Sequence, residues 1–103
     1  MEFQSRKLYR IDNYYWFLYP SKEKLSRFWA TCTAELWRVE YLANYYTQKI
    51  NEKVSYLPVS TIFYCVEQDH EMIHVLSPQG NGWLNVPNLS TYNKFFTMIT
   101  GET

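Results

Sequence analysis

Glycine, proline and cysteine are scarce in this chain, which has three glycines, four prolines and two cysteines among 103 residues. So little glycine and proline argues against a fibrous or loop-rich protein. Cys32 and Cys65 are isolated in sequence, and two cysteines are fewer than a small secreted disulfide framework normally carries. We therefore expect reduced thiols and a soluble, cytoplasmic protein.

An excess of charge of one sign is also missing, because ten Lys and Arg residues balance ten Asp and Glu residues. A neutral chain lacks the overall basic footprint of non-specific nucleic-acid or membrane binding. The charge is nevertheless uneven: residues 1–30 hold six basic and three acidic side chains, whereas residues 60–90 hold three acidic side chains and no Lys or Arg. We interpret these regions as two solvated faces.

Long hydrophobic runs are absent as well. The uncharged aromatic run from Asn13 to Ser21 is far too short to span a bilayer. The segment Met1–Lys7 has no apolar stretch typical of a signal peptide. No membrane contact is expected from these features.

Aromatic residues are plentiful, at 19% of the chain, and hydrophobic residues make up 47%. This content can build the core of one domain over residues 1–103, and it argues against disorder. Strands are expected over about 7–19 and 54–88, where aromatic and β-branched residues alternate with polar ones. Polar turns are expected at 68–71 and at 77–82, where Asn81-Gly82 is a strong local signal.

A helical insertion is predicted between these strand regions, over about residues 21–50. Pro20 ends the preceding strand, and Ser21 is a suitable N-cap. One apolar stripe repeats with a period of 3.6 residues, and it consists of Leu36, Val39, Ala43, Tyr46 and Ile50. A second stripe, at spacing i, i+4, i+8, consists of Trp37, Tyr41 and Tyr45. The spacing of Tyr92, Phe95, Phe96 and Ile99 predicts a short C-terminal helix or turn within 90–99.

The sequence His70-Glu71-Met72-Ile73-His74 matches the H-E-x-x-H pattern of zinc proteases. On a helix, His70 and His74 would bind one zinc ion, with Glu71 as the general base. The residues before it, Thr61–Val66, favour a strand, on which four residues span about 13 Å and separate the two imidazoles. A zinc metalloprotease is therefore an alternative hypothesis, and the main expectation is a protein without metal, cofactor or catalytic residues.

If the same region forms a β-hairpin instead of a helix, its residues resemble those of a known family. An apolar strand at 62–67, a return strand at 72–76 and the ending Gly82-Trp83-x-x-x-Pro87-Asn88 resemble the second half of an SH3 domain. Phe17-Leu18-Tyr19-Pro20 resembles the Ala-Leu-Tyr-Asp strand of that family. The resemblance implies an α+β fold: a small SH3-like antiparallel β-barrel with the helical insertion at about 21–50. It also implies a ligand groove around Tyr19, Pro87, Asn88 and Tyr92, although the groove tryptophan of SH3 domains is missing.

The expected function is therefore non-enzymatic binding of another protein, by an adaptor, an accessory subunit or an inhibitor of the kind that phages and mobile elements encode. Tyr and Trp favour interfaces because they combine a large contact area with a polar edge. The predicted partner-binding residues are Tyr19, Trp37, Tyr41, Tyr45, Pro87 and Tyr92. A second alternative is a nucleic-acid-binding barrel that uses Arg6, Lys7 and Arg10 beside Tyr9, Tyr14 and Tyr15.

Overall fold

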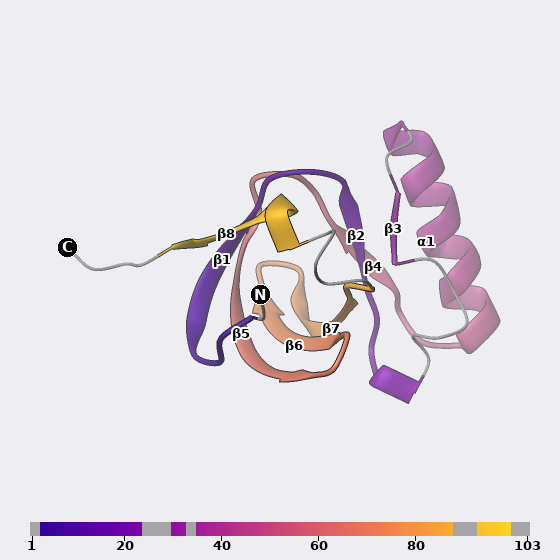
Figure 1. The fold of residues 1–103 in the computed structure, drawn as a ribbon. Helices are drawn as coiled ribbons and strands as arrows, with labels where there is room; N and C mark the ends of the chain where they lie inside the picture. Colours follow the sequence, from indigo (N-terminus) through magenta and orange to yellow (C-terminus); the bar gives the residue numbers. More distant parts are fainter. Residues whose placement is uncertain (1–2, 24–29, 33–34, 88–92, 100–103) are drawn as a thin grey trace.

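The computed structural model describes residues 3–23, 30–32, 35–87 and 93–99, which form an α+β fold with two antiparallel sheets and one α-helix (Figure 1). The larger sheet has the strand order β7-β6-β5-β1-β8, and the smaller sheet has the order β3-β2-β4. Along the chain the elements are β1 (Lys7–Ile11), β2 (Tyr15–Leu18), β3 (Thr31–Cys32), α1 (Leu36–Ile50), β4 (Ser55–Leu57), β5 (Ile62–Asp69), β6 (Met72–Ser77), β7 (Gly80–Asn85), the short 3-10 helix η2 (Asn93–Phe95) and β8 (Phe96–Ile99).

The five-stranded sheet is built around the hairpin of β5 and β6. Its strands alternate buried and more exposed positions, as a sheet with one face on a core must, and Phe63, Cys65, Ile73 and Val75 point inward. The turn between these strands is His70-Glu71, where His70 adopts a positive φ of 59°. The predicted hairpin is therefore confirmed. No pairing between β7 and β8 closes this sheet within the described part of the chain.

Strand β2 lies between two hydrophobic cores, so that the molecule has three layers. Trp16 and Leu18 enter the core of the five-stranded sheet, together with Leu57 of β4. Phe17 and Tyr19 point the opposite way, into the core beneath α1. Strand β2 is therefore covered on both faces, and α1 forms the outer layer on the right of Figure 1.

Helix α1 is shorter than the predicted insertion. Thr31-Cys32, inside the predicted span, forms a strand that pairs with β2, because these residues suit a pleated sheet better than a helix. Residues 24–29 and 33–34 of that span lie outside the described residues. The helix ends at Asn51, which adopts the left-handed conformation of a C-cap.

All five residues of the first apolar stripe are on α1, as predicted. Val39, Ala43, Tyr46 and Ile50 are buried against the smaller sheet. Leu36, in the first turn of α1, is exposed.

Two further predictions hold only in part. The turn predicted over 77–82 is present at Pro78-Gln79, but Asn81-Gly82, its strongest local signal, belongs to β7 and pairs with β6. The predicted C-terminal helix or turn is present as η2, after which Phe96–Ile99 form β8 and pair with β1. In both places, strand pairing extends further than the local signal indicates.

Candidate functional site

The exposed face of α1 carries the three aromatic residues of the second stripe. Trp37, Tyr41 and Tyr45 are 65%, 63% and 43% exposed, although each has a large apolar ring. They follow one another at successive turns of the helix, so they form one continuous patch on the side opposite the buried residues. We call these three residues the aromatic stripe.

Polar contacts fix the two ends of the aromatic stripe. The indole Nε1 of Trp37 donates a hydrogen bond to Glu35 Oε1 at 2.7 Å. The Lys49 ammonium lies 5.4 Å from the centre of the Tyr45 ring, within the range of a cation–π contact. Trp37 and Tyr45 thus each contact a charged side chain, and the Tyr45 ring also meets the edge of the buried Tyr46 ring, with 5.8 Å between ring centres.

The charges beside the stripe differ between its two sides. Arg38 and Lys49 are exposed and lie within one turn of Tyr41 and Tyr45, respectively. The carboxylate of Glu40 instead accepts a hydrogen bond from the Tyr56 hydroxyl at 3.1 Å. This hydrogen bond comes from a neutral hydroxyl, so Glu40 keeps its negative charge. The stripe is therefore bordered by basic side chains on one side and by the acidic Glu40 on the other.

The residues assigned to an SH3-type groove do not come together with the stripe. Tyr19 is fully buried, in contact with the rings of Phe17 and Tyr46, and it offers no surface to a partner. Burial raises the pKa of its hydroxyl above the ordinary value. Pro87 is half-buried, while Asn88 and Tyr92 lie outside the described residues.

The zinc-protease geometry is absent from the H-E-x-x-H segment. His70 is in the β5–β6 turn with its side chain in solvent, whereas His74 is on β6 and stacks on Trp83 at 4.7 Å between ring centres. A turn followed by a strand does not give the two imidazoles the shared helix face that the motif needs. The described residues also contain no cluster of three His, Cys, Asp or Glu side chains suited to a metal ion.

The stack of His74 and Trp83 belongs to a small polar cluster that the sequence analysis missed. Lys22 lies 5.4 Å from the Trp83 ring and binds Asp69 at 2.7 Å. This ion pair lowers the pKa of Asp69 and raises that of Lys22. Because 47 residues separate the two partners, no local pattern could have indicated their contact.

The cysteines are buried thiols. Burial, with the charge of Glu67 as a lesser cause, raises the pKa of the Cys65 thiol to about 11. A thiol with such a pKa is almost entirely protonated at neutral pH, so Cys65 is poorly suited to act as a nucleophile.

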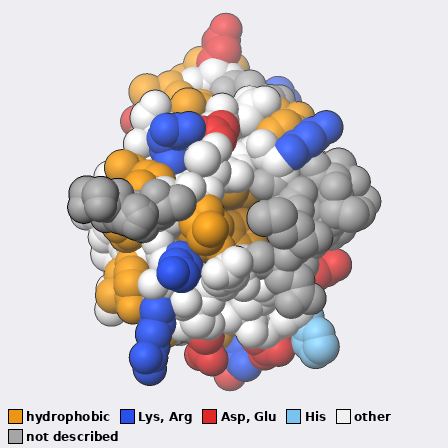
Figure 2. All heavy atoms as spheres, turned by 60° about the vertical axis from the view of Figure 1, so that its left-hand side comes forward, with side chains coloured by type: hydrophobic (Ala, Val, Ile, Leu, Met, Phe, Trp, Pro, Cys, Tyr) orange, Lys and Arg blue, Asp and Glu red, His pale blue; other side chains and the backbone are white. Residues whose placement is uncertain are grey.

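The basic N-terminal residues form a weaker candidate for nucleic acid than the sequence suggested. Arg6 and Lys7 are exposed, but Arg10 is paired with Asp12 at 2.8 Å. Tyr9 is buried and unable to stack on a base. Figure 2 shows the side of the molecule where β1 and β8 lie, on which hydrophobic side chains are interspersed with Lys and Arg.

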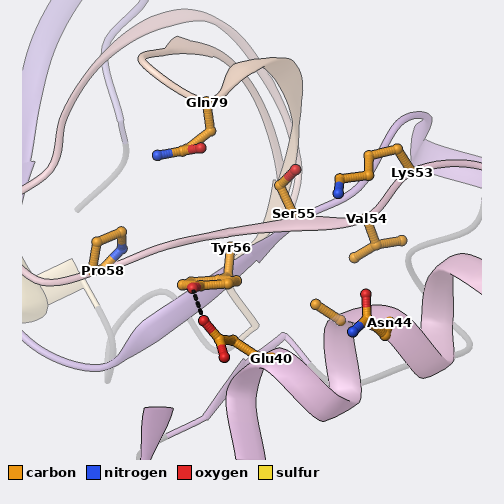
Figure 3. A pocket seen from close by; sticks show the side chains of 9 residues that line it. Glu40, Asn44, Lys53, Val54, Ser55, Tyr56, Pro58 and Gln79 are labelled. Atoms are coloured by element: carbon orange, nitrogen blue, oxygen red, sulfur yellow. Dashed lines mark hydrogen bonds between the residues drawn. The ribbon is translucent and has the colours of Figure 1, made fainter. Parts of the chain in front are cut away.

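A groove runs along β4, between α1 and the β6–β7 turn (Figure 3). Its main cavity has a volume of about 440 Å³, and Glu40 and Asn44 of α1 stand across it from Gln79. A second cavity of about 380 Å³ shares Lys53, Ser55 and Gln79 with the first, so the two form one continuous groove. No pattern in the sequence indicated this site, because the groove depends on how the helix and the two sheets meet.

Comparison of the chain with protein families, curated proteins and solved structures yields no match. In the part of the chain that the structure describes, no helix is long and apolar enough to cross a membrane. The function of each candidate site is therefore inferred from its own geometry and chemistry.

Proposed function

We propose that the chain is a protein-binding module and that the aromatic stripe of α1 is its contact surface. The observation that carries this proposal is the exposure of three large aromatic residues in one line, Trp37, Tyr41 and Tyr45. Exposed aromatic rings cost solvation free energy in a free domain, and they supply the buried anchors of protein interfaces.

The charges beside the stripe favour a partner surface that is apolar in the centre and acidic on the side that meets Arg38 and Lys49. Both of these side chains are exposed, and the negatively charged Glu40 lies on the other side of the stripe. Complementary rim charges speed association and suppress wrong partners. An adaptor, an accessory subunit or an inhibitor would each use such a surface.

We also propose that the larger sheet is an SH3-like barrel adapted to this role. Its support is the set of five consecutive antiparallel strands β7-β6-β5-β1-β8, with the residues of the family-like hairpin on β5, β6 and β7. The segment likened to the first strand of that family, Phe17–Pro20, lies at the smaller sheet. β1 is instead the strand beside β5.

The test compares capture of partners from a lysate of the cells that express the chain. The stripe variant is Trp37→Ala with Tyr41→Ala, and the control variant is Ile62→Ala with Leu76→Ala, two residues of similar kind that are exposed on the larger sheet. We expect a partner that the wild type and the control retain and the stripe variant loses.

Both variants must keep the thermal unfolding transition of the wild type for the comparison to count. If the stripe variant and the control variant retain the partner equally well, the stripe is not the contact surface. Unfolding of the stripe variant would show that its rings belong to the core.

A further inference from the structure

The outer edge of β4 is an unpaired sheet edge that opens into the groove. β4 is the last strand of the order β3-β2-β4, and no described strand lies beyond it. The groove is lined by α1 from one outer layer and by the β6–β7 turn from the other, with residues 53–56 and Pro58 between them. The groove therefore lies along the free edge of β4, with α1 on one side and the β6–β7 turn on the other.

The ladder register shows which backbone groups face the groove. Phe17 N donates to Ala30 O at 3.1 Å, on the β3 side of β2. The N–H and C=O of a strand residue point to the same side, so Phe17 and its partner across the sheet, Tyr56, form a non-hydrogen-bonded pair. The N–H and C=O of Tyr56 therefore point away from β2, toward the groove.

We propose that this groove binds an extended peptide segment of another protein, which adds as a fourth strand beside β4. Adding a strand to a sheet edge gives affinity through main-chain hydrogen bonds and specificity through alternate side chains. The peptide residue opposite Tyr56 exchanges both backbone hydrogen bonds with it.

The side chain of that peptide residue is basic. Residues directly opposite each other in a sheet place their side chains on the same face, and Tyr56 points toward α1, where its hydroxyl contacts Glu40. A Lys or Arg opposite Tyr56 therefore lies against an aromatic ring and within reach of the Glu40 carboxylate. The groove as a whole, with Glu40, Glu52 and Lys53, has one more acidic than basic side chain.

The test is an NMR titration of the ¹⁵N-labelled full chain with synthetic peptides. The first peptide is acetyl-Thr-Val-Thr-Lys-Thr-Val-Thr-amide, the second has Glu in place of Lys, and the third is N-methylated at the Lys amide. We expect the first peptide to shift the amides of Ser55, Tyr56 and Asn44 saturably, and the other two to bind at least about tenfold more weakly.

Protein variants separate the backbone contribution from that of the side chains. Tyr56→Pro removes both the ring and the backbone N–H, whereas Tyr56→Ala removes only the ring. The affinity of Tyr56→Pro for the Lys peptide should therefore be at least about fivefold lower than that of Tyr56→Ala. Glu40→Gln should reduce the preference for Lys over Glu. The stripe variant Trp37→Ala with Tyr41→Ala should bind the Lys peptide like the wild type, because this proposal does not depend on the aromatic stripe.

Three outcomes would overturn the proposal. They are the absence of any saturable shift at Ser55, Tyr56 and Asn44, equal affinity of the N-methylated peptide, and shifts of these amides that depend on protein concentration without peptide. The last would assign the edge to a second copy of the chain. The two peptide results need no protein variant, so they stand even if a Tyr56 variant fails to fold.

Discussion

The backbone amide of Trp83 donates a hydrogen bond to Tyr19 O at 2.8 Å, and the amide of Tyr19 donates to Trp83 O at 3.0 Å. This antiparallel bridge joins the end of β2 to β7 and so connects the two sheets. It brings the backbones of β2 and β7 so close that the neighbouring position, Gly82, has no room for a side chain. Through β2, the bridge fixes the layer beneath α1 relative to the larger sheet.

Replacing Gly82 with Ala should therefore destabilise the protein. A Cβ atom there would lie 2.7 Å from Leu18 Cγ and 2.8 Å from Tyr19 O, and the carbonyl oxygen belongs to backbone that the bridge holds in place. We expect a loss of about 1–3 kcal/mol in the free energy of unfolding, measured by urea denaturation. Asn81→Ala, at the exposed neighbouring position, is the control and should cost less than about 0.5 kcal/mol. Equal stability of the two variants would contradict the close approach.

The role of Gly82 also shows where sequence reasoning ends. Asn-Gly is a strong local turn signal, but the need for a residue without a side chain at Gly82 arises from β2, more than 60 positions earlier in the chain. The same holds for β3, β8 and the β4 groove, which exist only through pairing or stacking with distant segments. The β5–β6 hairpin and the buried face of α1 were predictable, because alternation and the 3.6-residue period are carried within each segment itself.

Tyr45 and Tyr46, neighbours in sequence, should respond oppositely to truncation. Tyr46 is buried among the rings of Phe17 and Tyr19, whereas Tyr45 belongs to the exposed aromatic stripe. We expect Tyr46→Ala to cost about 3–5 kcal/mol and Tyr45→Ala less than about 1 kcal/mol in unfolding free energy.

Urea denaturation of the two variants, beside the wild type, provides the comparison. A large loss for Tyr45→Ala would mean that the stripe stabilises the fold, and it would remove the main support for the proposed interface. A small loss for Tyr46→Ala would mean that the core beneath α1 contributes little to stability.

The Cys65 thiol should resist alkylation while the protein is folded. Its pKa of about 11 leaves roughly one thiolate in a thousand molecules at pH 8, against about a quarter for an unperturbed thiol. Labelling with iodoacetamide, followed by peptide mapping, should be at least about a hundredfold slower for Cys65 in buffer than in urea. Comparable rates in the two solvents would show that Cys65 is accessible.

The raised pKa of Cys65 also makes the free energy of unfolding depend on pH in the alkaline range. A raised pKa in the folded state means that the unfolded chain releases this proton first as the pH increases. The contribution of Cys65 to stability is therefore fully present below the ordinary thiol pKa of about 8.5, and it decreases as the pH rises toward about 11.

Asp12 should make a contribution to stability that disappears in acid. Its carboxylate accepts hydrogen bonds from the Thr97 hydroxyl of β8 and from Arg10, and these contacts, the Thr97 bond foremost, lower the pKa of Asp12. A lowered pKa in the folded state means that the contribution is present above the ordinary carboxyl value of about 3.9. It is lost as the pH falls through the lower folded value.

Asp12→Asn should therefore be less stable than the wild type at pH 6, by less than about 1 kcal/mol because the pair is solvent-exposed, and the difference should shrink at pH 2.5. Urea denaturation of both proteins at the two pH values measures this difference. The two proteins share all their other carboxylates, so the pH dependence that those groups cause is the same in both and does not contribute to the difference. Thr97→Val, which removes the main donor but keeps the side-chain shape, should give a similar difference at pH 6. A difference between Asp12→Asn and the wild type that stays the same from pH 6 to pH 2.5 would show that ionisation of Asp12 does not stabilise the junction of β1 and β8.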